Sequence, residues 1–185
     1  MSIKRVLIPA LLLFAIAEVL PAATEGGTKF SLFASVYKAE DYDKADGVGF
    51  RVAFGAAIQF ELTGAYYTKF DDGELELDGR PLSDIDFELD VIPIDAGVRF
   101  KLGTGPIYVA FGGTYYLLDA DGGSVDDEVG FYANFGVQFT NFFVETGYRE
   151  VEGKVEDLPI ASPDGDFEVD IGLSGVFLNI GWRFQ

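Results

Sequence analysis

The chain has 185 residues and a formal charge of −18, from 31 acidic and 13 basic residues, and it contains neither cysteine nor histidine. Without cysteine there can be no disulfide or thiolate metal site, and without histidine no imidazole base or metal ligand. The acidity argues against a nucleic-acid partner, which requires a basic face, while a hydrophobic content of 49% is too high for a disordered acidic segment. The length suits one domain with a sizeable core.

Residues 1–23 have the pattern of a secretory signal peptide. Lys4 and Arg5 precede an apolar run, Val6–Ala17, of 12 residues, which is short for a membrane-spanning helix. We expect cleavage after Ala17 or Ala23, so that 24–185 form the exported domain. The alternative is an uncleaved anchor helix.

From residue 24 onward, apolar and polar residues alternate with a period of two, which predicts β-strands. Eight segments show this pattern: 28–38, 46–58, 59–70, 84–102, 105–118, 127–140, 141–155 and 166–185. Tight connections at 57–59, 102–106 and 140–141 alternate with longer ones at 39–45, 71–83, 119–126 and 156–165. The sequence therefore predicts an all-β fold, an eight-stranded antiparallel up-and-down transmembrane β-barrel that follows a signal peptide.

Each expected strand has two unlike faces. In 46–58, Val48 and Phe50 lie on one face, whereas Gly49 and Arg51 lie on the other. The second kind of face is rich in glycine and poor in lysine, which suits a narrow lumen better than the outer surface of a lipocalin-like soluble barrel. We therefore expect the apolar face to meet lipid, where a closed barrel satisfies every backbone group without water.

The apolar parity changes along several expected strands. In 84–102, the residues from Ile85 to Val91 are apolar at odd positions, and those from Ile92 to Phe100 at even positions. A β-bulge is one explanation, and Pro93 is compatible with it. We favour the other explanation, in which the strand stays regular and leaves the bilayer, so that its apolar side turns from lipid to the interior, with local irregularities at Pro93 and at Ser174–Gly175.

Such an inversion predicts an apolar upper lumen. Its lining would be Leu75, Leu77, Ile85, Phe87, Leu89, Val91, Val151, Val155, Phe167, Val169, Ile171 and Leu173. These side chains form either a dry plug or a pocket for an apolar molecule. In a barrel of eight strands we favour the plug, because the interior is just wide enough for side chains to fill.

Acidic residues gather at the long-loop end, where 26 of the 31 fall within 40–46, 71–90, 119–128 and 150–170. Seven other charged residues are expected inside the barrel at bilayer depth: Arg51, Glu61, Asp95, Arg99, Glu145, Arg149 and Arg183. Because unpaired charges there would be costly, we expect the pairs Glu61–Arg99 and Glu145–Arg183 in a low layer, with the other three one layer higher. A gate or ion path is one interpretation, and a network that fills and fixes the lumen is the favoured one.

The acidic loops raise the question of Ca²⁺. Asp119–Glu128 has carboxylates at both ends, but Gly130 stands where an EF-hand needs its bidentate glutamate. We therefore favour a solvated surface, with divalent cations at the acidic loops as the alternative, and expect no cofactor and no specific metal site. Aromatic residues near the ends of the apolar bands suggest interfacial girdles: Tyr37, Tyr66, Phe70, Tyr115, Tyr148, Trp182 and Phe184.

Three stretches carry a family resemblance: "IPIDAGVRF" (92–100), "FFVETGYRE" (142–150) and "GVFLNIGWRF" (175–184). With them, residues 24–185 resemble the small OmpA/OmpX-like outer-membrane β-barrel superfamily, as a barrel without a peptidoglycan-binding domain. The resemblance implies the outer membrane of a Gram-negative-type bacterium, extracellular loops, and a monomer in contact with outer-membrane lipid and the barrel assembly machinery. The last strand resembles the assembly signal of that superfamily, although Gln185 follows Phe184.

Two functions remain open from the sequence. The first is a non-enzymatic outer-membrane barrel with a role in envelope integrity or surface interaction, acidic extracellular hairpins and a mostly filled lumen. The second is an OmpW-like narrow channel or a binding site for a small hydrophobic molecule. Barrel enzymes that resemble this architecture rely on a histidine, which the chain lacks, so we expect no enzymatic activity.

Overall fold

The computed structural model describes residues 27–40, 42, 44–70, 76–77, 80–81, 89–120, 124–125, 127–156 and 169–184. The expected signal peptide, 1–23, lies outside these residues. Within the described ranges, no helix is long and apolar enough to cross a membrane.

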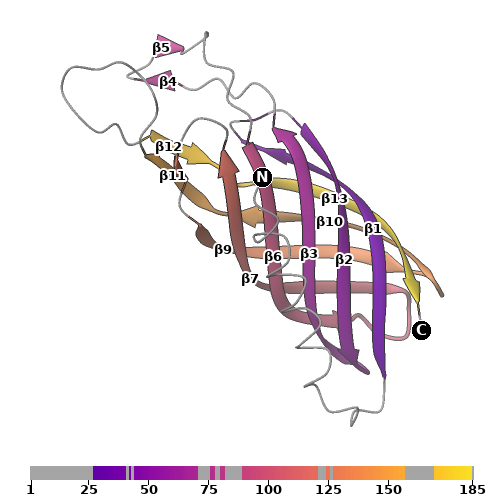
Figure 1. Cartoon of the computed structure of the whole chain (residues 1–185). Coiled ribbons are helices and arrows are strands. Elements are labelled where there is room, and N and C mark those ends of the chain that lie inside the picture. The colour runs from indigo at the N-terminus through magenta and orange to yellow at the C-terminus, as the bar shows by residue number, and fades with distance from the viewer. Residues whose placement is uncertain are drawn as a thin grey trace.

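Eight antiparallel strands close into a barrel (Figure 1), which confirms the predicted fold class. Around its wall they follow the order β1-β13-β10-β9-β7-β6-β3-β2, so that the first and last strands pair with each other. The strands are β1 (Thr28–Ala39), β2 (Lys44–Gly55), β3 (Ile58–Phe70), β6 (Leu89–Lys101), β7 (Ile107–Ala120), β9 (Glu128–Gln138), β10 (Phe142–Glu150) and β13 (Gly175–Phe184).

Three tight turns lie at one end of the barrel, here called the tight-turn end, and the longer connections lie at the other, the loop end. The turns span 56–57, 102–106 and 139–141; the second has the expected bounds, and the other two begin one residue earlier than expected. Two of them use a glycine with positive φ, Gly55 (115°) and Gly103 (66°), a conformation that residues with a Cβ rarely adopt.

Short strands extend beyond the wall at the loop end (Figure 1). A three-stranded sheet has the order β12-β11-β8, and β4 pairs with β5. The expected strands 141–155 and 166–185 are thus each divided in two, and the expected loops 71–83 and 119–126 contain short strands. The bounds are β4 (Glu76–Leu77), β5 (Arg80–Pro81), β8 (Ser124–Val125), β11 (Glu152–Glu156) and β12 (Val169–Gly172).

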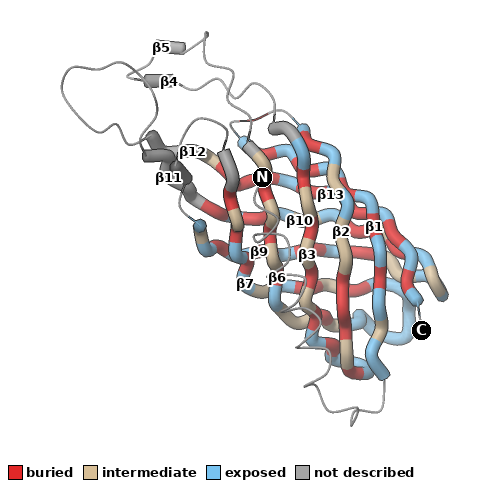
Figure 2. Tube along the Cα trace, viewed as in Figure 1, coloured by how far each residue is buried: buried red, intermediate tan, exposed pale blue. Residues whose placement is uncertain are grey.

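Burial alternates along the wall strands (Figure 2), and it shows which face points outward. Ile180 is 45% exposed, whereas Arg51, Arg99 and Glu145 are at most 2% exposed. The apolar residues therefore form the outer wall and the charged residues face the lumen, which is the arrangement of a transmembrane β-barrel and the reverse of a soluble one.

In β6, the apolar residues change from odd to even positions, yet the backbone pairing of β6 with β7 is regular. Val91, Asp95 and Arg99 are all buried at odd positions, so the inward parity is constant while its chemistry changes from apolar to charged. The β6–β7 register is continuous from Leu89↔Ala120 to Lys101↔Tyr108. Over the described part of the strand, inversion of polarity is therefore correct; residues 82–88 lie outside it.

The β10–β13 hairpin keeps its register across the break that separates it from β11 and β12. Arg149 pairs with Gly175, and three residues further on Glu152 pairs with Gly172. At the break, the Ser174 hydroxyl accepts a hydrogen bond from Val151 N at 3.0 Å and donates to Val151 O at 3.1 Å. At the expected irregularity, Ser174–Gly175, the Ser174 side chain thus makes the hydrogen bonds to Val151 that backbone groups make elsewhere in the ladder.

A bulge does occur in β3. The β3–β6 ladder is interrupted opposite Pro93, as expected, and its register shifts by one residue between Tyr67 and Phe70. Proline lacks the N–H that the ladder needs, which explains the interruption. The irregularity near Pro93 therefore lies in the β3–β6 ladder, while the β6–β7 ladder stays regular.

Candidate functional site

Charged and hydroxyl-bearing side chains from six wall strands meet in the lumen nearer the tight-turn end. We call them the lower network: Arg51 (β2), Glu61 (β3), Arg99 (β6), Tyr108 (β7), Tyr132 (β9), Glu145 (β10) and, from a seventh strand, Asn179 (β13). Alternation places each of them on the inner face of its strand. All seven are buried, so their charges are shielded from solvent and must satisfy one another.

Glu145 is the centre of the lower network. Arg51 contacts both of its carboxylate oxygens, with Nη1 donating to Oε2 at 2.9 Å and Nη2 to Oε1. Tyr108 donates to Oε2 at 2.6 Å, Asn179 donates to Oε1 at 2.8 Å, and Arg99 Nη2 lies 3.5 Å from Oε2. The carboxylate thus receives donors from four other strands, which uses its acceptor capacity fully.

Glu61 is the second carboxylate of the network. Arg99 Nη2 lies 2.8 Å from Glu61 Oε2, Arg51 Nε lies 3.7 Å from the same oxygen, and Tyr132 donates to Oε1 at 3.1 Å. The structure therefore places Glu61 beside Arg99, the partner that the sequence indicates. Arg99 also stacks on the Tyr108 ring, with Cζ 4.0 Å from the ring centroid.

The expected pair Glu145–Arg183 is wrong. Glu145 lies opposite Asn179 in the β10–β13 register, and Arg183 is four residues nearer the tight-turn end. Arg51, which we expected one layer higher, reaches Glu145 from β2 instead. Layer counting along single strands misses this contact because a long guanidinium side chain crosses the lumen.

Above the lower network, Arg149 on β10 and Asp95 on β6 form a second ion pair, here called the upper pair. Arg149 Nε donates to Asp95 Oδ1 at 3.1 Å and Nη2 donates to Oδ2 at 2.7 Å. The guanidinium packs against the rings of Phe177 at 4.2 Å and Tyr37 at 5.6 Å. Asp95 and Arg149 were expected in one layer, and the structure brings them together there.

Lumen tyrosines surround the upper pair, and the sequence analysis missed most of them. Tyr37, expected in an interfacial girdle, is fully buried instead; its hydroxyl contacts that of Tyr116 at 3.0 Å and donates to Leu173 O. Tyr67 hydrogen-bonds Ser35 at 2.6 Å. The sequence does contain a signal for this position. Tyr37 is two residues from the inward-facing Ser35 and therefore lies on the same face of the strand. Other expected girdle residues do face outward, with Tyr115, Tyr148, Trp182 and Phe184 between 41% and 51% exposed.

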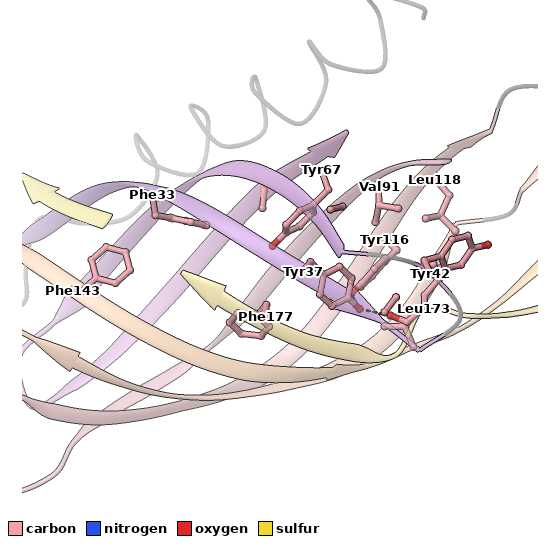
Figure 3. Close-up of a cluster of buried hydrophobic side chains, with 14 residues drawn as sticks. Phe33, Tyr37, Tyr42, Tyr67, Val91, Tyr116, Leu118, Phe143, Leu173 and Phe177 are labelled. Atoms are coloured by element: carbon pink, nitrogen blue, oxygen red, sulfur yellow. Dashed lines mark hydrogen bonds between the residues drawn. The ribbon is translucent and has the colours of Figure 1, made fainter. Parts of the chain in front are cut away.

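Apolar side chains lie above the upper pair, toward the loop end. Of the expected lining, Val91, Val151 and Leu173 have described side chains, and all are at most 2% exposed. These three residues, together with Tyr42 and Leu118, are here called the apolar cap. All five belong to one larger cluster of buried side chains (Figure 3). The side chains of the other nine residues lie outside the described part: Leu75, Leu77, Ile85, Phe87, Leu89, Val155, Phe167, Val169 and Ile171.

The described residues hold no group of three or more acidic side chains arranged to bind a metal ion. In the acidic segment Asp119–Glu128, Asp127 instead accepts hydrogen bonds from Tyr115 Oη at 2.9 Å and from Leu118 N at 3.4 Å. The lumen carboxylates are all engaged by cations or hydroxyls. Chemically, this arrangement cross-links the strands.

A closed eight-stranded barrel with an apolar outer wall and a charged lumen is the architecture of a small transmembrane β-barrel, and solved outer-membrane proteins share this fold. The outer-membrane protein Ail of Yersinia pestis, in a phospholipid bilayer nanodisc, shares the fold at a TM-score of 0.52, with 14% identity over 86% of this chain and all of that one.

Two further solved structures match with lower scores. The crystal structure of Ail has a TM-score of 0.44, with 16% identity over 87% of this chain and all of that chain. Neisserial surface protein A has a TM-score of 0.41, with 17% identity over 84% of this chain and 94% of that chain. No protein-family model and no curated protein matches the chain.

Proposed function

We propose that this chain is a non-enzymatic outer-membrane protein of a Gram-negative-type bacterium, whose sealed barrel holds acidic loops at the cell surface in a role of envelope integrity or surface interaction. The observation that carries the proposal is the cross-linked lumen. Arg51–Glu145 joins β10 to β2, and Arg149–Asp95 joins β10 to β6. In the barrel order each partner strand is three places from β10, in opposite directions.

These two braces support a filled lumen rather than a conducting one. A path for ions needs hydrated charges that exchange partners, whereas these guanidiniums are stacked on rings and bound to buried carboxylates. The apolar cap adds a dry layer above them. The same contacts leave Glu61, Asp95 and Glu145 at most 3% exposed, so none is presented to a substrate as an acid or base.

The distribution of charge supports the orientation and the partners. With 26 of 31 acidic residues in the four long-loop segments, the loop end suits the aqueous exterior and the short turns suit the periplasm. The proposed partners are outer-membrane lipid on the outer wall, the barrel assembly machinery during biogenesis, and divalent cations as counter-ions at the loops of a monomer. The outer-membrane protein Ail has a similar barrel, and the surface-interaction role is offered by that analogy.

Conductance in planar lipid bilayers tests the sealed lumen. We expect no steady conductance from the wild-type protein, and openings from the double variant Arg51→Ala/Glu145→Ala, which removes one brace and shows that the assay is sensitive. Steady wild-type conductance would support the narrow channel instead. Co-purification of a small hydrophobic molecule seated in the apolar cap would support the binding-site alternative.

Labelling of single cysteines tests the orientation, because the chain has no cysteine of its own. Lys44→Cys lies at the loop end and Thr140→Cys in a tight turn, and both positions are exposed. A membrane-impermeant maleimide should label Lys44→Cys on intact cells, and Thr140→Cys only after the outer membrane is permeabilised. The reverse pattern would refute extracellular loops.

A further inference from the structure

Among the residues that the structure describes, the lumen contains four guanidiniums and three carboxylates. Arg51, Arg99, Arg149 and Arg183 are balanced only by Glu61, Asp95 and Glu145, and each of these three carboxylates is engaged by other arginines. Arg183 forms no ion pair or hydrogen bond through its side chain within the described part of the chain, although it is only 6% exposed. Unlike Arg99 Nε and Arg149 Nη1, the guanidinium nitrogens of Arg183 are not fully buried, so an anion that enters the lumen from this end can reach them. A cation with so little exposed surface is stabilised by such a counter-charge.

Arg183 is held in place at the tight-turn mouth of the lumen. Its backbone N–H donates to Asn141 O at 2.6 Å, and it pairs with Ser31 in the β1–β13 register. The same parity that turns Ser31 and Arg183 inward also turns Lys29 inward, diagonally across from Arg183. Side chains in such diagonal positions are within reach of one another.

Two lysines share this mouth with Arg183. Lys29 lies at the tight-turn end of β1, paired with Ala53, and Lys101 lies at the tight-turn end of β6, paired with Tyr108. Lys101 ends β6 on the inward parity of Arg99 and is exposed. Glu61, a carboxylate of the lower network, is already neutralised by Arg99 at 2.8 Å. Counted over the described residues alone, the mouth is therefore positively charged on a protein whose overall charge is −18.

We propose that the tight-turn mouth of the lumen binds a phosphate-class oxyanion, with Arg183 as the main ligand and Lys29 and Lys101 as its flanking cations. A guanidinium offers a planar pair of donors that matches two oxygens of such an anion, and the lysines add point charges at the open side. The oxyanion is either a free phosphate or phosphate ester or the headgroup of an anionic phospholipid; the recognition chemistry is the same.

Titration with inorganic phosphate at constant ionic strength tests the site. The full chain is folded into phosphatidylcholine nanodiscs, and binding is followed by 31P line broadening and by the thermal midpoint from the fluorescence of Trp182, the single tryptophan. We expect saturable binding with a stabilised midpoint. Arg183→Gln should weaken binding about tenfold, since one charge-assisted contact is lost, whereas Lys44→Gln, which removes the same charge at the loop end, should leave it unchanged.

Two further variants separate binding from folding. Arg183→Lys keeps the charge but loses the planar pair of donors, so its affinity for phosphate should lie between those of the wild type and Arg183→Gln. Lys101→Gln changes an exposed side chain, so the barrel should fold normally, and should weaken phosphate binding about threefold. Non-saturable binding, equal affinity of Arg183→Gln and the wild type, or an equal loss in Lys44→Gln would each overturn the proposal.

The source of the oxyanion is resolved by changing the lipid. The experiment is repeated in nanodiscs that contain phosphatidylglycerol. If the headgroup is the occupant, the thermal midpoint of the wild type is already raised there, that of Arg183→Gln is not, and added phosphate no longer shifts the midpoint. If the shift persists there, the occupant is a free anion.

Discussion

Arg149 and Asp95 meet across the lumen in a two-point contact, at 3.1 Å and 2.7 Å, although they stand on strands three places apart in the wall. The contact is buried, and the guanidinium lies between the rings of Tyr37 and Phe177. It therefore fixes the distance between β6 and β10 at the level of the bilayer. Several measurable consequences depend on contacts of this kind.

Removing one member of the upper pair should be strongly destabilising. Asp95→Asn leaves the Arg149 charge buried without a counter-charge, and we expect the free energy of unfolding to fall by about 3 kcal/mol. Urea unfolding in phospholipid vesicles measures it. Asp90→Asn, which removes only the charge from the partly exposed acceptor of Tyr66 at 3.0 Å, is the control and should cost under about 1 kcal/mol. Equal effects of the two variants would contradict a structural role for the upper pair.

We expect the Ser174 hydroxyl to contribute substantially to the stability of the barrel at the loop end. Ser174→Ala leaves both Val151 N and Val151 O without their partner at a buried position, which we expect to cost about 1–3 kcal/mol. Hydrogen exchange should show faster exchange at Val151 and at Glu40, whose amide donates to Ser174 O at 2.8 Å. Thr140→Ala, in an exposed turn, should leave both amides unchanged. Unaltered exchange in Ser174→Ala would refute this bridging role.

Gly136 provides the space in which Tyr108 reaches Glu145. A Cβ at Gly136 would collide with the Tyr108 ring and lie too close to the Glu145 side chain, whereas a Cβ at Gly64 would meet no atom within 4 Å. Gly136→Ala should therefore destabilise the barrel by about 1–3 kcal/mol through overpacking, and Gly64→Ala by less than about 0.5 kcal/mol. Thermal unfolding of the two variants side by side measures the difference, and similar midpoints would show that the lower network adapts freely.

The depth of the outer wall can be mapped by charge insertion. Ile180 lies midway along β13 and Phe184 at its end, and both face outward. Ile180→Arg should reduce the free energy of unfolding in vesicles by about 2–4 kcal/mol, and Phe184→Arg by about 0–1 kcal/mol, because the cost of a cation falls toward the interface. Equal costs at the two positions would place the bilayer elsewhere on the barrel.

The sequence predicts the wall of this barrel well and its interior only in part. Alternation with period two depends on a single strand, so the eight wall strands and the three tight turns could be located from residue order alone. The inward position of Glu145 follows in the same way. The ion-pair partner of Glu145 cannot be predicted in this way, because the choice between Arg51 and Arg183 depends on strand register and on the reach of a side chain across the lumen.

The interior tyrosines show a second limit. Tyr37 and Tyr148 both stand near the end of an apolar band, and residue type alone places both in a girdle. Only parity relative to Ser35 or to Arg149 separates the buried tyrosine from the exposed one. Likewise, the sequence indicates an irregularity at Ser174–Gly175, but it does not show that the Ser174 side chain replaces the ladder hydrogen bonds there, since its partner is 23 residues away.

The pairing of β1 with β13, from Phe30↔Phe184 to Ala39↔Gly175, has a consequence for biogenesis. Because this pairing joins the first strand of the barrel to the last, the sheet stays open until the β10–β13 hairpin has formed. Translocation must therefore be complete before closure, and a nascent chain arrested before β13 would expose two unzipped edges to any chaperone or protease that it meets.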